Sequence, residues 1–371
     1  MLEQRPLVGR PRNLAQHRDK LSGPGDVASG EYSDSHPLTT MGRIGVLLIN
    51  VGTPEALSYW AMRRYLKEFL SDRRVVNAHG PVWWFVLNAL ILTRKPSHSA
   101  EAYSKIWDKQ LDESPLKTIT RRQAERVGSA LGASSADTQI EVAWAMRYGE
   151  PAIGPALVRL QKRGCDRILL FPLYPQYSSA TTATALDKAF EALRGMCWQP
   201  AVRTMPAYYD QPCYIDAVAG SLYAHIKTLS FEPEKVLLSF HGLPREFLAM
   251  GDPYVCQCEE TAQLLRPVLG IDPDRVLLTF QSQTGRKEWH TPFTDQTVIE
   301  LAQSGVKNLV VVTPGFAADC IETLEEIAIR ARDSFLQHGG ENFSFVPSLN
   351  DSDQSVEMLN ALIAGQLRGW L

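Results

Sequence analysis

The 371-residue chain lacks the sequence signatures of several large functional classes. Neither half carries a Gly-x-Gly-x-x-Gly after its first apolar segment, nor a Gly-Lys-Thr or Gly-Lys-Ser phosphate loop, so nucleotide binding has no support. There is no basic block, and the net charge is only −3, so nucleic-acid binding is not indicated. The six cysteines show no Cys-x-x-Cys pair of the zinc-ribbon kind, and reduced thiols in a cytosolic protein are expected.

Residues 1–40 also lack hydrophobic periodicity, and we predict a disordered N-terminal tail ahead of Met41, a second candidate start. This segment has no apolar signal-peptide core, and its five acidic residues are untypical of a transit peptide. We therefore expect a bacterial cytoplasmic protein. The chain is 44% hydrophobic and 21% charged, so it can bury a large core, and its length favours two domains.

From Met41 onward, short apolar segments alternate with helical stretches, which is the pattern of a parallel sheet flanked by helices. The predicted strands form two groups of four, beginning near Ile44, Glu141, Ile168 and Val202, and near Val236, Val276, Leu309 and Phe343. The predicted fold class is therefore α/β, with two doubly wound, Rossmann-like domains over residues 41–215 and 216–371. The cleft between the domains is the expected active site.

An acidic segment follows one of these strands. The apolar run over residues 308–316 leads into DCIETLEE at residues 319–326. Glu322 and Glu326 are four residues apart and would share one face of a helix, where like charges repel unless a metal ion or a proton lies between them. A simpler interpretation is that these carboxylates complement the dipole of a helix start and need no function.

A histidine, His241, ends the predicted strand over residues 235–240 and is followed by Gly242-Leu243-Pro244. Ligands bind at the carboxyl ends of strands in open parallel sheets, and imidazole can exchange a proton near neutral pH or ligate a transition metal. The Gly and Pro indicate a sharp turn rather than a packed core position. This context favours a functional histidine over a structural one.

Four more segments accompany these two: LLINVGTP at 47–54, Ser114-Pro115, PLYPQYS at 172–178 and GDPY at 251–254. In this order, from about residue 43 to the C-terminal region, the segments resemble the ferrochelatase family. The resemblance implies a lyase that inserts ferrous iron into protoporphyrin IX, forming protohaem and releasing two protons in the terminal step of haem synthesis. It also implies the chelatase fold, which is the same arrangement of two doubly wound domains.

The resemblance assigns catalytic residues as well. His241 and Glu322 would form the metal-insertion centre, both as catalytic groups and as metal ligands, with Glu326 one helical turn behind. Two pyrrole protons leave as the metal enters, so the chemistry needs a base, and carboxylates can relay protons or hold a hydrated metal ion. Whether His241 is chiefly the base or a ligand stays open. The resemblance places seven residues around the porphyrin: Arg94, Tyr103 and Ser114 near the propionates, and Arg147, Tyr148, Trp289 and Phe316 along the pocket.

An almost uninterrupted apolar run over residues 81–92 lies between Arg73-Arg74 and Arg94-Lys95. It is too short to span a bilayer. One interpretation is a buried helix. The interpretation we favour is an apolar lip at the pocket mouth that dips into a membrane interface, with tryptophans at headgroup depth and cations facing anionic lipid. This predicts peripheral contact with the inner membrane, which would help a poorly soluble porphyrin to arrive.

Three features depart from the family pattern. Cys320 stands where some relatives carry histidine, and it is either a thiolate ligand or a small buried hydrophobe. Arg330 stands where some relatives continue the acidic line, and it could form a salt bridge to Glu326. No cysteine follows residue 350, so the terminal set that holds a 2Fe–2S cluster in animal relatives is absent, and Cys256 and Cys258 form only a Cys-x-Cys pair. We predict no cofactor beyond the substrate Fe²⁺.

Three other functions fit parts of the sequence. A chelatase for cobalt, or for a tetrapyrrole with more carboxylates such as coproporphyrin, would share the fold but should carry more cationic anchors. A non-catalytic porphyrin or haem carrier would keep the slot and the lip but would not need Glu322 and Glu326. An unrelated transferase would need a glycine-rich phosphate loop, which is missing. The oligomeric state, the iron donor and any protein partners are not determined by the sequence.

Overall fold

The computed structural model describes residues 42–371 except 79, 135–138 and 286, and the predicted tail over residues 1–40 lies outside the described residues. All eight predicted strands are present and form two four-stranded parallel sheets, which confirms the predicted fold class. The first sheet has the order β2-β1-β3-β4, and the second has the order β6-β5-β7-β8. The strands are β1 (Arg43–Gly52), β2 (Ile140–Tyr148), β3 (Cys165–Pro172), β4 (Ala201–Thr204), β5 (Lys235–His241), β6 (Val276–Gln281), β7 (Asn308–Val312) and β8 (Asn342–Val346).

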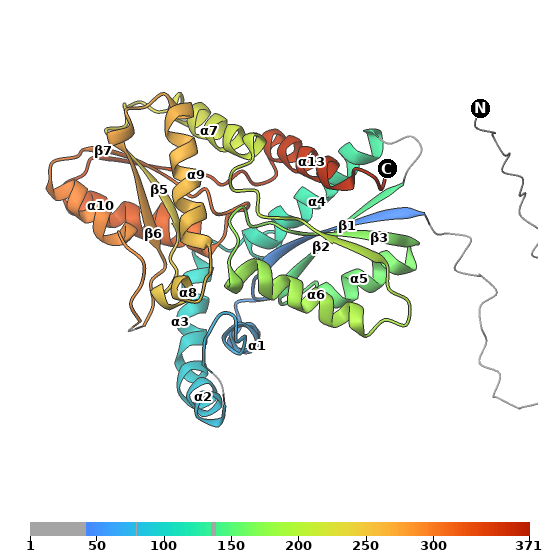
Figure 1. The fold of residues 1–371 in the computed structure, drawn as a ribbon. Coiled ribbons are helices and arrows are strands. Elements are labelled where there is room, and N and C mark those ends of the chain that lie inside the picture. Colours follow the sequence, from blue (N-terminus) through green and yellow to red (C-terminus); the bar gives the residue numbers. More distant parts are fainter. Residues whose placement is uncertain (1–41, 79, 135–138, 286) are drawn as a thin grey trace, which may run out of the picture. The chain divides into compact units, whose positions relative to one another are not determined.

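Helices follow nearly every strand and cover the sheets, as Figure 1 shows. In the first half they are α1 (Tyr59–Leu70), α2 (Pro81–Phe85), η3 (Val86–Ile91), α3 (Leu92–Ser104), α4 (Pro115–Ser134), α5 (Ile153–Lys162), η4 (Ser179–Ala183) and α6 (Thr184–Arg194). In the second half they are α7 (Pro212–Ile226), α8 (Arg245–Ala249), α9 (Tyr254–Leu269), η5 (Pro273–Arg275), α10 (Thr294–Gln303), α11 (Ile321–Thr323), η6 (Leu324–Ala331), α12 (Arg332–Gln337) and α13 (Asp353–Leu367). The segments η3, η4 and η6 are π-helices.

The central strands are buried on both faces, which explains their continuous apolar sequences. Residues Ile44 to Asn50 of β1 and Val236 to Phe240 of β5 are all buried. Parallel strands that carry helices on both faces have no solvent-facing side and therefore lose the apolar-polar alternation of an exposed sheet. Polar side chains can then face solvent or a ligand only where these strands end.

One large apolar cluster contains residues of both sheets, including Leu48 of β1 and Leu238 of β5. The last helix, α13, packs against both α4 and α7, so the C-terminus returns to the first half of the chain. The division into domains at residues 215 and 216 stays a prediction.

The apolar run 81–92 is not one regular helix. It forms α2, the π-helix η3 and the start of α3, and Figure 1 shows α2 and α3 extending away from the first sheet. Trp84 is 63% exposed and Leu90 is 60% exposed, whereas Leu87 is 2% exposed. The interpretation as a wholly buried helix is therefore wrong. In the part of the chain that the structure describes, no helix combines the length and the apolar character needed to cross a bilayer.

Candidate active site

His241 and Gln281 lie opposite each other at the carboxyl ends of neighbouring strands β5 and β6. The Nδ1 atom of His241 lies 2.6 Å from the carbonyl oxygen of Gly242. A carbonyl can only accept, so Nδ1 carries a proton and donates, and in the neutral ring Nε2 then has the lone pair. His241 is partly exposed, so this lone pair is available to a proton or to a metal ion.

Gly242 leaves room for the ring of Trp289. A Cβ at position 242 would stand 2.7 Å from the carbonyl oxygen of Gln281 and 3.2 Å from the ring of Trp289, so only glycine leaves room here. The indole Nε1 of Trp289 donates to the carbonyl of Thr284 over 3.0 Å, which fixes the ring. The ring of the predicted pocket residue Trp289 therefore lies against Gly242, the residue after His241.

The predicted acidic residues begin the helical segment after β7. Glu322 belongs to α11, and its carbonyl oxygen accepts from Nε2 of Gln281 over 2.6 Å. Glu326 belongs to η6, and its Oε2 atom accepts from Oγ of Ser282 over 2.5 Å. Ser282 has a φ of 66°, a left-handed conformation that is uncommon outside glycine. Two residues at the end of β6, Gln281 and Ser282, therefore bind the segment that carries Glu322 and Glu326.

The electrostatics of Glu326 link the three predicted catalytic residues. Burial is the largest influence and raises the pKa of Glu326, and the negative charge of Glu322 raises it further. The hydrogen bond from Ser282 and the charges of His241 and Arg330 act in the opposite direction without cancelling the rise. His241, Glu322 and Glu326 thus lie within interaction range of one another.

Arg330 forms the salt bridge to Glu326 that the sequence suggested, with 3.3 Å between Nη2 and Oε1. Its shorter contact joins Nε to Oε2 of Glu325 over 2.7 Å. In a π-helix the backbone hydrogen bonds join residues i and i+5, so residues four and five apart both face the same way. Arg330 can therefore bind both neighbouring carboxylates at once.

Cys320 lies just before Glu322 and is buried. Burial raises the pKa of its thiol well above the ordinary value, and the charge of Glu322 adds to this rise. The thiol stays protonated at neutral pH, which favours the small buried hydrophobe over the thiolate ligand. Burial likewise raises the pKa of Tyr103 and of Tyr65, and the nearby Glu322 contributes to both shifts. The predicted residue Tyr103 therefore lies close to the acidic helix start.

Arg147 and Tyr148 join a buried polar network. The Nη2 atom of Arg147 lies 2.5 Å from Oδ2 of Asp72, which also accepts from the Tyr148 hydroxyl over 2.8 Å. Arg147 donates to the hydroxyl and carbonyl of Thr184 as well, and only 12% of its side chain is exposed. Burial would raise the pKa of Asp72, but the hydrogen bonds from Thr184 and Tyr148 and the charge of Arg147 hold it below its ordinary value.

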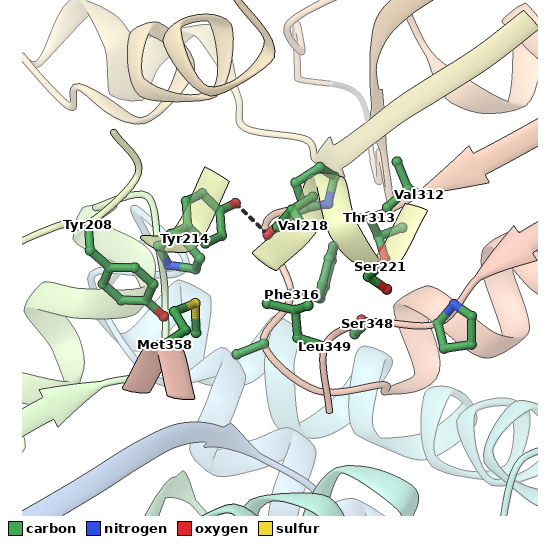
Figure 2. A pocket seen from close by; sticks show the side chains of 14 residues that line it. Tyr208, Tyr214, Val218, Ser221, Val312, Thr313, Phe316, Ser348, Leu349 and Met358 are labelled. Carbon is green, nitrogen blue, oxygen red and sulfur yellow. Dashed lines mark hydrogen bonds between the residues drawn. The ribbon is translucent and has the colours of Figure 1, made fainter. Parts of the chain in front are cut away.

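Three predicted residues remain: Arg94, Ser114 and Phe316. In the described part of the chain, no hydrogen bond or ion pair joins them to His241, Glu322 or Glu326. Arg94 is exposed on α3. Ser114 is 1% exposed, and its hydroxyl has no partner among the described residues. Phe316 lines a cavity of about 20 Å³ with Tyr208, Thr313 and other residues, shown in Figure 2. This cavity has room for about one water molecule, and the porphyrin contact of Phe316 stays a prediction.

Comparisons with known proteins identify the family of this chain. The family model described as Ferrochelatase matches residues 43–367. A protein named ferrochelatase from Rhizobium meliloti (strain 1021) is 52% identical over 92% of this chain and 100% of its own length. A ferrochelatase from Methylocella silvestris is 50% identical over 91% of this chain and 98% of its own length. The chain belongs to the ferrochelatase family.

Solved structures also share this fold. SirB from Bacillus subtilis with Fe³⁺ matches with a TM-score of 0.52 at 12% identity, over 87% of this chain and 94% of that protein. The sirohydrochlorin chelatase SirB from Bacillus subtilis subspecies spizizenii, in complex with cobalt, matches with a TM-score of 0.50 at 12% identity, over 88% and 96% of the two chains. At this identity the likeness concerns the fold alone.

Several residues at the site of this family member were missed by the sequence prediction. They are Tyr65, Asp72, Lys105, Ser282 and Glu325. Ser282 could have been found, because it directly follows a predicted strand at the carboxyl edge of the sheet. Within the described residues, no group of three His, Cys, Asp or Glu side chains is arranged to hold a metal ion. The assignment of His241 and Glu322 as donors to a substrate metal stays a prediction.

Proposed function

We propose that the chain inserts ferrous iron into protoporphyrin IX, forming protohaem and releasing two protons. Membership of the ferrochelatase family supports this reaction. The observation that carries it is the contact of His241 Nδ1 with the Gly242 carbonyl, which leaves Nε2 as the atom able to act as a base, within interaction range of Glu326, whose pKa is raised. A base next to a carboxylate that can take up and release a proton is what removal of two pyrrole protons requires.

The three side chains divide the work. Nε2 of His241 takes a pyrrole proton, while the hydrogen bond from Nδ1 to Gly242 holds the ring in the required tautomer. Glu322, partly exposed, offers carboxylate oxygens to the incoming iron. Glu326 receives this proton from His241, whose Nε2 can then take the second pyrrole proton, and the raised pKa of Glu326 brings its protonation closer to neutral pH. Two protons leave as one divalent ion enters, so the charge on the porphyrin core is unchanged.

An anaerobic assay with ferrous iron and protoporphyrin tests the reaction, with porphyrin loss and haem formation followed spectroscopically. We expect turnover in the wild type and a loss of at least about 100-fold in Glu322→Gln. Glu191→Gln is the matched control, since Glu191 is an exposed carboxylate on α6. Porphyrin binding without turnover in the wild type would contradict the proposal and favour a carrier, unless cobalt or coproporphyrin, tested in parallel, proves to be the substrate.

We further propose that the lip contacts the surface of a membrane on its cytoplasmic side. Val82 is 77% exposed, and Trp84 and Phe85 are exposed by more than half, so an apolar surface faces outward from α2. Arg73, Arg94 and Lys95 on either side of the run are exposed and can face anionic lipid. No protein partner and no cofactor beyond the substrate iron belong to this proposal.

Two neighbouring tryptophans allow a matched test. Trp84 is exposed, whereas Trp83 is partly buried and its Nε1 donates to the carbonyl of Leu70 over 3.2 Å. Trp84→Ser should weaken binding to vesicles of anionic lipid and leave the melting temperature unchanged. Trp83→Ser should lower the melting temperature. Unchanged vesicle binding in Trp84→Ser would show that the lip is not a membrane contact.

A further inference from the structure

Two contacts join the acidic helix start to the elements that carry the lip. We call α1, α2, η3 and α3 the lip unit. Its apolar core includes Met62 of α1, Leu87 of η3 and Leu92 of α3, and Ile321, the first residue of α11, packs against this cluster. The second contact is an ion pair between Lys105, which directly follows α3, and Glu325, with 3.0 Å between Nζ and Oε1. Ile321 and Glu325 lie on either side of Glu322 in the sequence.

The carboxylate of Glu325 is unusual for its position. Only 5% of its side chain is exposed, although Glu326 next to it is 22% exposed and faces Ser282. A buried carboxylate is tolerated only when it is paired, and here Lys105 binds one oxygen and Arg330 binds the other. Glu325 is therefore a fixed point, and the helix turn on which it lies cannot rotate without breaking both ion pairs.

The opposite side of the same turn is held by the second sheet. Gln281 binds the carbonyl oxygen of Glu322, and Ser282 binds the carboxylate of Glu326. Gln281 is itself held, because its Oε1 atom accepts from the hydroxyl of Ser239 over 2.8 Å. The position of Glu322 is thus defined from two directions, by the end of β6 and by the lip unit.

We propose that Lys105 and Glu325 are positioning residues for metal insertion, which hold Glu322 in register with the lip unit at the mouth of the site. Neither side chain touches the reacting atoms. Their ion pair joins residues 220 positions apart in the sequence. Through it, the position of α3 fixes the position of the turn that carries Glu322 and Glu325. A displacement of about 1 Å at a catalytic group can reduce the rate by about 100-fold. This role rests on the proposed metal-insertion function.

The test compares Lys105→Met with a matched control, Lys188→Met. The two lysine side chains are 44% and 45% exposed, and each forms one ion pair, of 3.0 Å and 2.8 Å. With detergent-solubilised protoporphyrin, Lys105→Met should lower kcat about tenfold and leave the porphyrin KM within about twofold. Lys105→Arg should restore kcat to within about threefold of the wild type, because the longer cation can still reach Glu325.

Amide hydrogen exchange, followed by mass spectrometry, gives a readout that does not depend on activity. Peptides covering residues 321–331 should exchange about tenfold faster in Lys105→Met and at the wild-type rate in Lys188→Met. Wild-type kcat in Lys105→Met overturns the positioning role, whatever the exchange shows. Equal acceleration along the whole chain also overturns it, since that indicates general destabilisation. If the wild type lacks turnover but exchange accelerates locally, the ion pair does position this turn, and it is the metal-insertion function that fails.

Discussion

Replacement of Arg147 by methionine distinguishes a structural role from the porphyrin contact that the sequence predicts. The side chain of Arg147 is 12% exposed and its guanidinium is bound to Asp72 and Thr184, so little of it is free for a propionate. Removal of one partner from a buried ion pair typically costs about 3–5 kcal/mol, because the other charge stays buried without compensation. For a chain of this length, such a loss lowers the melting temperature by about 4–7 °C.

The assay is thermal unfolding of Arg147→Met beside a matched control, Arg64→Met. Arg64 pairs with Glu55 over 3.5 Å, but both side chains are largely exposed, so the control should lose at most about 1 kcal/mol. Arg147→Met combined with Asp72→Asn should be more stable than Arg147→Met alone by at least about 1 kcal/mol, since the buried charge is removed. An Arg147→Met protein with wild-type stability but a weakened affinity for porphyrin would refute this reasoning.

The difference in unfolding free energy between the wild type and Arg147→Met should depend on pH, because the pKa of Asp72 is lowered. A carboxylate with a lowered pKa in the folded state stabilises the fold above its unfolded pKa, and this contribution is lost as the pH falls through the folded value. The stability gap between wild type and Arg147→Met should therefore be full above about pH 4 and should shrink at lower pH. Unfolding by urea at several pH values measures this gap.

Three further outcomes are expected. Glu326→Gln should raise the free energy of unfolding at pH 7, because the raised pKa of Glu326 means that its ionised form destabilises the fold. Urea unfolding should show this gain vanishing below about pH 4.3, where the carboxyl is protonated in both the folded and the unfolded state. The same substitution should lower turnover. His241→Ala should reduce turnover by at least about 100-fold while porphyrin binding, measured by fluorescence quenching, persists; near-normal turnover would remove His241 from the mechanism. Cys320→Ala should keep turnover within about twofold, because the thiol is protonated, and should lose about 1 kcal/mol of stability; a collapse of turnover with the fold intact would restore the thiolate ligand.

The strands and their carboxyl ends could be predicted from sequence, whereas the long-range pairing could not. All eight strands were predicted, the central ones from their buried apolar runs, although β4 has no buried residue. The rule for strand ends pointed to His241 and Glu322, whose charges both influence Glu326. Nothing local indicates that Lys105 pairs with Glu325, 220 positions away. The π-helix η6 was also missed, because the spacing of its apolar residues is compatible with an α-helix.

Glu325 and Glu326 show how this π-helix matters to the chemistry. They are neighbours in sequence, yet one is buried between Lys105 and Arg330, and the other faces Ser282 and has a raised pKa. The pKa of Glu326 is raised by burial and by the nearby charge of Glu322. Because the π-turn lets Arg330 reach residues four and five positions back, a single cation anchors Glu325 and moderates Glu326. The same turn thus supplies a fixed anchor and a group able to carry protons.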